Sequence, residues 1–559
     1  MKKITLYLCT LIFITATFSY LLPNYYDPWR TVYHEYLMFA TFLLLFIKIL
    51  IDHPNLQINR KIISIFIISL IPLMQNIFGK IYFFGDALIA FIYIFSFGIA
   101  VLIGINLRRN LGLDKIIRFI SGVFICAGLI SSYIILKQWL LLSNGGIWSV
   151  DLPSGGRPFA NFAQPNNCAS FLLLSALATL YIFEKKIINH LSAIGLIVLL
   201  LFCLALTQSR AAWVFIICFL VWWFWKINSF SARLSKYLIF CPLGVLILFI
   251  WTIPYLSSSL EIISTSDIIT RVTTGYQRIP MWHQMLLAIS DEPIWGYGWN
   301  QVSVAQLSIY LKYPISVWTE HSHNIFLDLL IWNGVPIGST IIAFFIIWLW
   351  QLSKLTKSVE IFIGLAMMGV LIVHSMFEYP LEYAFFLLPM GLILGALSFD
   401  LYDEGVKFFS KNIGMIVFII STILFTWIFI EYRCVEEDTR LLQFELKNIG
   451  ETHAIQDAPN IMLLTQLRER IRFLRTQPQN NITQEQMIRM RQVTYRYGDS
   501  INLYKYAQLL LLNNKRESAK RYLLILSGMH QKEVAIESLY NINDSLNYKW
   551  KRAQVLNHE

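Results

Sequence analysis

Residues 191–226 read LSAIGLIVLLLFCLALTQSRAAWVFIICFLVWWFWK, which is two apolar runs separated by a four-residue turn. The only charged residues are Arg210 in that turn and Lys226 at the end. A helix that crosses a bilayer needs about 20 mostly apolar residues, and each run comes close to that length. The stretch therefore predicts a hairpin of two membrane-spanning helices.

The composition of the whole chain agrees with this prediction. Of 559 residues, 56% are hydrophobic and 14% are charged, and the mean hydropathy is +0.57. A soluble globular chain carries about 25% charged residues. A disordered, fibrous or disulfide-rich secreted protein is excluded, and an ordinary cytosolic enzyme is disfavoured. None of the seven cysteines forms a CxxC pair, so the sequence indicates neither a metal site nor a disulfide framework.

The same length rule predicts an all-α, polytopic membrane protein with about thirteen spans. They are expected at residues 4–22, 35–51, 62–78, 85–106, 119–136, 167–183, 191–206, 211–226, 237–256, 335–352, 359–374, 383–399 and 413–431. The first run lacks an A-x-A cleavage site, so we expect a retained span and not a signal peptide. The domains are then nine spans in 1–256, a large loop in 257–334, four spans in 335–431 and a tail in 432–559.

Basic residues predict which side of the membrane each loop faces. The loops on the same side as the N-terminus hold seventeen Lys and Arg residues, and the short loops on the other side hold five. Because cytoplasmic loops are enriched in Lys and Arg, the N-terminus is expected inside, with the large loop and the tail outside. We therefore attribute the net charge of +11 to residues that orient the chain in the membrane and contact its lipids, and we expect no nucleic acid partner.

The tail has helical periodicity at 460–475, 500–513 and 515–528. The sequence YKYAQLLLLNNKRESAKRYLLIL, from Tyr504 to Leu526, predicts two antiparallel helices that are broken at Asn513-Asn514. Such a pair resembles one tetratricopeptide hairpin, although a small helical domain of another kind explains it equally well.

Polar and ionisable residues gather in five segments that the topology places on the outer face. Because such groups are costly near a membrane, they carry a functional hypothesis. The segments are GGRPFANFAQPNN (155–167), TQSRAAW (207–213), TRVTTGYQRIPMWHQ (270–284), TEHSHNIFLDLLIWNGVPIG (319–338) and HSMFEYPLEY (374–383). The chemistry is therefore expected outside the cytoplasm, where no supply of nucleotide phosphates exists.

Arginines in these segments are candidates for an anion site. Gln208 and Arg210 form a tip rich in hydrogen-bond donors, and Arg271 and Arg278 are seven residues apart, about two helical turns. Arginine binds phosphate oxygens in a bidentate manner, so several converging arginines suit a diphosphate close to the bilayer. The alternatives are that Arg210 reaches for lipid headgroups and that the other two arginines bind anionic lipid.

Histidines supply candidates for proton transfer. His321 and His323 are separated by one residue and followed by Asn324; a histidine with a pKa near neutrality can accept a hydroxyl proton or bind a phosphate. A zinc pair is the competing idea, but a third ligand of suitable spacing is missing. His374 and Glu378 are four residues apart, which pairs them on a helix and fits a structural role at a turn. There is no D-x-D motif, P-loop or G-x-G-x-x-G motif, which disfavours a metal-dependent nucleotide-sugar transferase and an ATP-driven pump.

These motifs resemble the O-antigen ligase/polymerase superfamily of bacterial membrane glycosyltransferases. The resemblance rests on QSRAAW, on PIWGYGWNQ (293–301) and on HSHNIFLDLLIWNGVPIG (321–338), in which nine residues separate His323-Asn324 from Gly334. Three positions after Gly334, where the family has a glycine or a small polar residue, this chain has Ile337. The glycine, Gly338, comes one position later. The segments GGRPFANFAQPNN and HSMFEYPLEYAFFLLPMGLILG, together with the tail, are similar to the PglL-type protein O-oligosaccharyltransferases.

The resemblance implies a GT-C-like fold and an inverting transfer without metal or other cofactor. The donor would be an oligosaccharide on undecaprenyl diphosphate at the periplasmic side of the bacterial inner membrane. The acceptor would be a Ser or Thr hydroxyl of an exported protein such as a pilin. The residue roles that it implies are diphosphate binding by Arg210, Arg278 and Arg271; orientation or deprotonation of the acceptor by His323, with His321 as the alternative; and substrate binding or loop ordering by Arg157, Gln164, Asn166, Gln208, Asn324, His374 and Glu378.

Two other functions compete with this one. An O-antigen ligase that acts on lipid A core, or an O-antigen polymerase, would use the same chemistry on another acceptor. A transporter of lipid-linked sugars would place paired polar residues in the middle of its spans. The predicted spans are nearly uncharged and the polar residues lie at one face, so an enzyme is favoured.

Overall fold

The thirteen predicted spans all coincide with helices in a computed structural model of the chain, which describes residues 2–142, 146–152, 156–262, 278–401, 407–447, 449 and 457–540. Eleven helices or helix pairs of this described part are long and apolar enough to cross a membrane. Two shorter apolar helices, Leu6–Phe18 and Val359–His374, occupy the other two predicted positions. The prediction of an all-α polytopic membrane protein is confirmed.

The chain divides into two compact units. Unit 1 comprises Met1–Ile68, Tyr93–Arg271 and Phe345–Thr422, and unit 2 comprises Ser69–Ile92, Val272–Phe344 and Ile423–Glu559. The apolar helices are α1 (Lys2–Phe18), α2 (Val32–Asp52), α3 (Arg60–Ser69), α4 (Ile71–Ile77), α5 (Phe84–Leu111), α6 (Leu113–Trp139), α7 (Pro165–Glu184), α8 (His190–Thr207), α9 (Arg210–Lys226), α10 (Phe240–Ser259), α14 (Ile325–Lys354), α15 (Val359–His374), α16 (Ala384–Ser398) and α17 (Lys411–Leu446).

The third predicted span, at 62–78, is interrupted. The helix α3 ends at Ser69 and α4 begins at Ile71, with Pro72 in the first turn of α4. Proline has no backbone N–H, so the hydrogen bond that would join the two helices at this position is missing. The length of the apolar run did not predict this break, although Pro72 in the sequence indicates it.

A second break lies in α14. Gly334 has φ 72° and ψ 171°, which is not helical, so α14 consists of two helices, 325–333 and 335–354. The second helix begins where the span at 335–352 was predicted to begin. The left-handed φ favours glycine, because a Cβ atom would be strained there.

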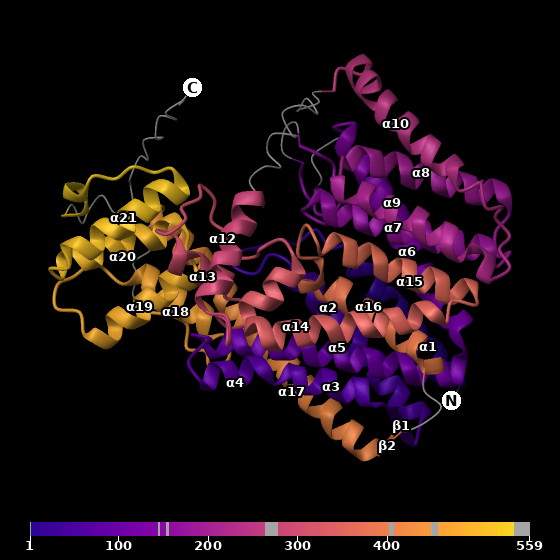
Figure 1. Ribbon diagram of the computed structural model, residues 1–559, viewed down its shortest axis with the longest axis horizontal. Coiled ribbons are helices and arrows are strands. Elements are labelled where there is room, and N and C mark those ends of the chain that lie inside the picture. Colours follow the sequence, from indigo (N-terminus) through magenta and orange to yellow (C-terminus); the bar gives the residue numbers. More distant parts are fainter. Residues whose placement is uncertain are drawn as a thin grey trace. The chain divides into compact units, whose positions relative to one another are not determined.

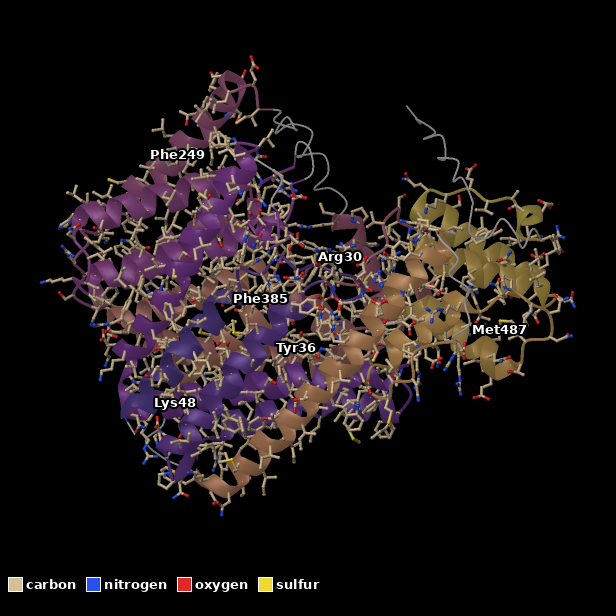
Figure 2. The ribbon with its side chains drawn as sticks, turned by 180° about the vertical axis from the view of Figure 1, so that it is seen from behind. Arg30, Tyr36, Lys48, Phe249, Phe385 and Met487 are labelled. Carbon is tan, nitrogen blue, oxygen red and sulfur yellow. The ribbon has the colours of Figure 1, made fainter. Side chains whose placement is uncertain are left out.

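In unit 1 the helices α6, α7, α8 and α9 lie side by side (Figure 1), and α7 is the most buried of the candidate spans. Aromatic rings fill the interior beside α7. Tyr20 stacks on Phe171 at 4.4 Å between ring centroids, and its hydroxyl donates to the carbonyl of Phe385 at 2.7 Å. Figure 2 labels Phe385, which belongs to α16. The candidate polar segments of unit 1 are thus attached to closely packed helices.

Contacts between loops of unit 1 agree with the predicted alternation of sides. The strands β1 (Asn55–Ile58) and β2 (Lys407–Ser410), from two loops predicted inside, pair antiparallel. Lys185 and Glu360, also in segments predicted inside, form an ion pair at 2.6 Å. On the opposite side, the side chain of Asn166 donates to Glu378 at 3.2 Å. The assignment of the first side to the cytoplasm rests on the basic residues alone.

Unit 2 contains the large loop from Val272 onward and the tail. Its further helices are α12 (Arg278–Asp291), α13 (Val302–Ile309), α18 (Thr465–Arg475), α19 (Gln484–Arg496), α20 (Ser500–Leu512) and α21 (Arg516–His530). The predicted hairpin is present, because α20 packs on α21 and the turn contains Asn514 at φ 58°. The helix α19 was not predicted; its start has a capping box of Thr483 and Gln486. Leu307 and Tyr310, at the end of α13, belong to the same buried cluster as α19, α20 and α21, so the loop and the tail share a core.

Candidate active site

The turn between α8 and α9 presents the arginine that the sequence singled out. Gln208 ends α8 in a left-handed conformation, Ser209 is at the N-cap position of α9, and Arg210 is the first residue of α9. Gln208 and Arg210 are exposed, whereas Ser209 is buried. The guanidinium of Arg157 donates to the carbonyls of Thr207 and Gln208 at 3.4 and 3.5 Å. Arg157 and Arg210 thus flank one turn, at the N-terminal end of a helix, where a partial positive charge also favours anions.

Asn166 holds two other segments next to this turn. Its side-chain nitrogen donates to Glu378 Oε1 at 3.2 Å, and its oxygen accepts from the hydroxyl of Ser209 at 2.9 Å. One helical turn further on, Ser170 contacts His374 Nδ1 at 2.8 Å. Glu378 and His374 are both buried. These contacts join three segments that are far apart in sequence.

The loop before α7 is fastened by two residues that the sequence did not single out. Gln138 Oε1 accepts from the backbone N–H groups of Phe159 and Ala160 at 3.0 and 2.9 Å. Asn161 is fully buried and donates to the carbonyls of Leu21 and Trp148. The available signal was Gln138 itself, a polar residue near the end of an apolar helix. Gln164 is the N-cap residue of α7, and its side chain makes no cap hydrogen bond.

In unit 2 the segment from Thr319 to Asn324 is held by hydrogen bonds at Thr319, Ser322 and Asn324. The N–H of Thr319 donates to Gln306 Oε1 at 3.0 Å, and the N–H of Ser322 donates to Asp328 Oδ1 at 2.8 Å. Asn324 Oδ1 accepts from the N–H groups of Phe326 and Leu327, so it caps α14. The two histidines occupy the positions between these ties.

His321 and His323 are half-buried on either side of buried Ser322. His323 has φ 55°, a left-handed conformation that is uncommon for a residue with a side chain. Strained backbone of this kind persists only where surrounding contacts enforce it, and it is frequent at functional sites. His323 therefore has a left-handed backbone conformation within the turn, and Asn324 is the N-cap residue of α14.

The helix α12, which begins at Arg278, contacts this histidine turn through Trp282. The indole N–H of Trp282 donates to the carbonyl of Ser322 at 2.9 Å. Arg278 is four residues before Trp282, so both lie on the same face of α12. Arg271 lies outside the described residues, and its predicted pairing with Arg278 is not described. Within the residues that the structure describes, no three His, Cys, Asp or Glu side chains are grouped so that they could hold a metal ion.

The PIWGYG and NGVPIG segments pack backbone against backbone at Gly296 and Gly334, where a side chain would not fit. The N–H of Tyr297 donates to the carbonyl of Ile331 at 2.8 Å, and the N–H of Val335 donates to the carbonyl of Pro293 at 2.7 Å. A Cβ atom on Gly296 would lie 2.4 Å from Ile331 O. The two backbones therefore approach more closely than any side chain permits. This contact fixes the C-terminal end of the helix that begins after His323-Asn324.

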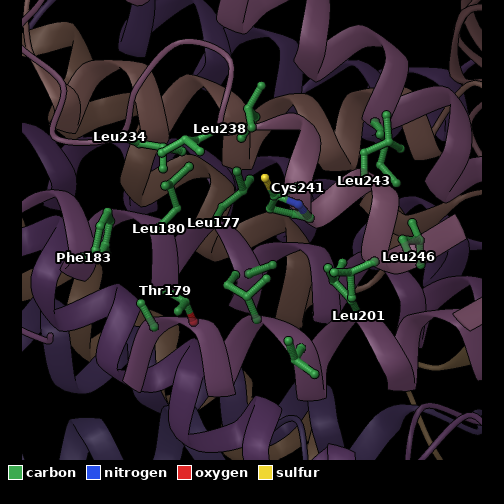
Figure 3. Close-up of a pocket in the computed structure, with 18 of the residues that line it drawn as sticks. Leu177, Thr179, Leu180, Phe183, Leu201, Leu234, Leu238, Cys241, Leu243 and Leu246 are labelled. Carbon is green, nitrogen blue, oxygen red and sulfur yellow. The ribbon is translucent and has the colours of Figure 1, made fainter. Parts of the chain in front are cut away.

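A cavity of about 400 Å³ lies between α7, α8, α9 and α10 in unit 1. Leucines and other apolar side chains form nearly all of its wall, as Figure 3 shows for Leu177, Leu201 and Leu246. Its volume is within the range of about 300–1,000 Å³ that is typical of ligand sites. Such a wall suits a hydrocarbon group and offers little to a sugar or a peptide.

The predicted site residues therefore fall into two clusters within the described residues. Unit 1 brings together the side chains of Arg157, Asn166 and Glu378 with the Gln208–Arg210 turn, and places His374 one helical turn from Asn166. Unit 2 brings together His321, His323 and Asn324, with Arg278 on the helix that contacts their turn. Sequence reasoning missed the residues that hold these groups, which are Gln138 and Asn161 in unit 1 and Trp282, Gln306 and Asp328 in unit 2.

Comparisons with known proteins match nearly the whole chain. A family profile described as O-antigen ligase matches residues 195–342, and one described as virulence factor membrane-bound polymerase, C-terminal, matches residues 362–536. A general O-oligosaccharyltransferase of Acinetobacter baylyi is 31% identical over 95% of this chain and 94% of its own length. A ComP-specific O-oligosaccharyltransferase of the same organism is 29% identical over 70% of this chain and 71% of its own length. The matched regions include Arg210, the histidine turn and the tail.

Proposed function

Because the chain belongs to the PglL-type protein O-oligosaccharyltransferases of the O-antigen ligase superfamily, and is thus a multi-pass membrane glycosyltransferase, we propose which substrates it uses and where. The donor is an oligosaccharide on undecaprenyl diphosphate. The acceptor is a Ser or Thr hydroxyl of an exported protein, for which a pilin is one candidate. Transfer takes place at the periplasmic face of the inner membrane, inverts the anomeric carbon and needs no metal ion.

The match to the general O-oligosaccharyltransferase over 95% of the chain is the observation that carries this proposal. It favours a protein acceptor over lipid A core, since both curated relatives are named as O-oligosaccharyltransferases and one is named as specific for ComP. An O-antigen ligase is the second candidate, because the profile of that description covers the segment with Arg210 and His323.

The turn between α8 and α9 is proposed as the diphosphate site. Arg210 is exposed at the start of α9, and Arg157 is fixed beside it by the carbonyls of Thr207 and Gln208. Two guanidinium groups and the first N–H groups of a helix would oppose the charge of the leaving diphosphate. Arg278 and Arg271 are proposed as further ligands from the large loop.

His323 is proposed as the residue that accepts the proton of the acceptor hydroxyl, with His321 as the alternative. The hydroxyl oxygen forms a bond to the anomeric carbon, the bond from that carbon to the diphosphate oxygen breaks, and the hydroxyl proton passes to the imidazole. The diphosphate leaves on its lipid carrier. The ties at Thr319, Ser322 and Asn324 support this role, because they hold the backbone on both sides of each histidine.

The cavity between α7 and α10 is proposed to take part of the polyprenyl chain. Phe215 and Phe219 of α9 line it, and α9 begins at Arg210. With a rise of 1.5 Å per residue, Phe215 is about 7.5 Å along the helix from Arg210. A lipid whose diphosphate binds at Arg210 would reach the cavity with its first isoprene units.

One comparison tests the proposed function. Intact masses of exported proteins are measured in cells with and without this gene, and lipid A core is analysed in parallel. We expect glycan mass on protein only when the gene is present. Glycan on lipid A core, with unchanged proteins, would establish the ligase instead. A reaction with purified protein and a chelator tests metal independence, and loss of activity that a divalent ion restores would refute it.

A further inference from the structure

Arg496, the last residue of α19 in the tail, joins two carboxylates from distant parts of unit 2. Its Nε and Nη2 atoms donate to the two oxygens of Asp86 at 3.1 Å each. Its Nη1 atom donates to Glu320 Oε1 at 3.3 Å. Asp86 lies in the first turn of α5, and Glu320 directly precedes His321. One guanidinium therefore connects the tail, the start of a span and the histidine turn.

This ionic cluster is largely shielded from water. The exposed fractions of the side chains are 4% for Asp86, 13% for Arg496 and 40% for Glu320. Burial acts to lower the pKa of Arg496, but Asp86, Tyr497 and Glu320 outweigh it and raise that pKa above its usual value. The arginine accordingly stays charged at every physiological pH. A buried charge that loses its partner is costly, so the geometry of the cluster is strongly held.

Arg496 forms two ion pairs, which we call its arm to Asp86 and its arm to Glu320, and their consequences can be separated. The arm to Asp86 attaches α19 to α5 and would suffice to anchor the tail. The arm to Glu320 reaches a residue of the histidine segment between the backbone ties at Thr319 and Ser322. A role confined to anchoring needs only the first arm. The second arm adds a side-chain tie at the position next to His321.

We propose that Arg496 is a positioning residue, which through Glu320 holds the His321–His323 turn in its working geometry, so that the C-terminal tail is part of the catalytic unit. This rests on the proposed function, in which that turn handles the acceptor hydroxyl. Catalysis depends steeply on such positioning, since a displacement of about 1 Å can cost on the order of 100-fold in rate. A loosened turn would impair the chemical step more than substrate binding.

The test separates positioning from anchoring. Glu320→Ala removes the second arm and leaves the Arg496–Asp86 pair in place. We expect its kcat to fall by about 10-fold with KM values for donor and acceptor unchanged. Arg489→Met is the matched control, because Arg489 lies on the same helix and forms an exposed ion pair with Glu485; its kinetics should equal those of the wild type. The double variant Glu320→Ala/Arg496→Met should be no slower than Arg496→Met alone.

Hydrogen exchange provides a readout that does not depend on transfer. In full-length protein, the amides of 319–324 should exchange faster in Glu320→Ala than in the wild type or in Arg489→Met. If exchange accelerates but the wild type transfers no glycan, the tie is supported and the proposed function fails. If Glu320→Ala has wild-type kcat and unchanged exchange, the positioning role of Arg496 is wrong.

Discussion

The carboxylate of Asp328 accepts a hydrogen bond from the backbone N–H of Ser322 at 2.8 Å, and this bond closes the turn that carries His321 and His323. Asp328 is buried in the first turn of α14. The helix and its surroundings therefore fix the position of the carboxylate. The carbonyl of the same residue, Ser322, accepts a hydrogen bond from the indole N–H of Trp282. The residue between the two histidines is thus held from two directions by side chains of two helices.

Asp328→Ala should therefore lower transfer without preventing folding of the bundle. The N–H of Ser322 loses its partner and the turn relaxes, so we expect kcat to fall about 10- to 100-fold with little change in KM. Asp328→Asn keeps an acceptor oxygen and should retain more activity than the alanine variant. Steady-state kinetics on both variants check this; equal activities of Asp328→Ala and the wild type would show that the bond does not matter for transfer.

Gly334→Ala should destabilise unit 2. Its Cβ atom would lie 2.2 Å from Ile294 O, and its φ of 72° disfavours a side chain. Strain and overpacking together should cost ~2–4 kcal/mol. Gly195→Ala is the matched control, because nothing lies within 4 Å of the added atom in α8. Thermal melting in detergent should show a large loss for the first variant and none for the second, and similar melting temperatures for both would contradict the predicted clash.

The fold could be predicted from the sequence because a membrane leaves few structures that satisfy the hydrogen bonds of the backbone. An apolar run of sufficient length must form a helix, and the thirteen predicted positions required no knowledge of packing. The break at Pro72 and the helix α19 were missed for local reasons. Proline interrupts an otherwise apolar run, and α19 is too rich in polar residues to stand out by hydropathy.

The candidate site could be predicted only in part. Its charged and aromatic chemistry is visible in the sequence, and Arg210, Asn166, His323 and Asn324 were named from it. Gln138 is visible in the sequence as a polar residue near the end of an apolar helix, but its backbone partners at Phe159 and Ala160 are set by packing and could not be predicted. Which segments meet within each unit also depends on packing.

Ala193→Trp tests the proposed place of the polyprenyl chain. Ala193 lines the apolar cavity, and an indole there would occupy part of its volume. We expect KM to rise several-fold for an undecaprenyl donor and to stay unchanged for a donor with a short prenyl chain. Val221→Trp, at an exposed position of α9 outside the cavity wall, is the control. Equal KM values of Ala193→Trp and the wild type for the long donor would exclude the cavity as the lipid site.

Lys505 predicts a pH dependence of tail stability. Burial lowers the pKa of Lys505 to about 7, whereas in the unfolded chain a lysine titrates near 10.4. Below pH 7 both states are protonated and the folded state bears the full cost of the buried charge. From pH 7 to 10 the unfolded state binds more protons, so the tail becomes more stable as the pH rises.

Lys505→Met removes that cost. It should raise the free energy of unfolding by ~1–3 kcal/mol at pH 6 and by less at pH 9, because Lys505 of the folded wild type is already deprotonated at pH 9. Melting of the full-length protein at both pH values measures the difference. A gain that is the same at pH 6 and pH 9 would mean that Lys505 titrates normally in the folded tail.

The central claim is that this chain transfers a lipid-linked glycan to protein through the turn at His323. Its most direct test is the intact mass of an exported acceptor protein after incubation with purified enzyme and undecaprenyl-diphosphate oligosaccharide. His283→Ala is the matched control, since His283 is an exposed histidine of the same unit that packs against Tyr313. We expect a glycan adduct with the wild type and His283→Ala and no adduct with His323→Ala at equal folding. An adduct formed by His323→Ala at the wild-type rate would exclude His323 from the reaction.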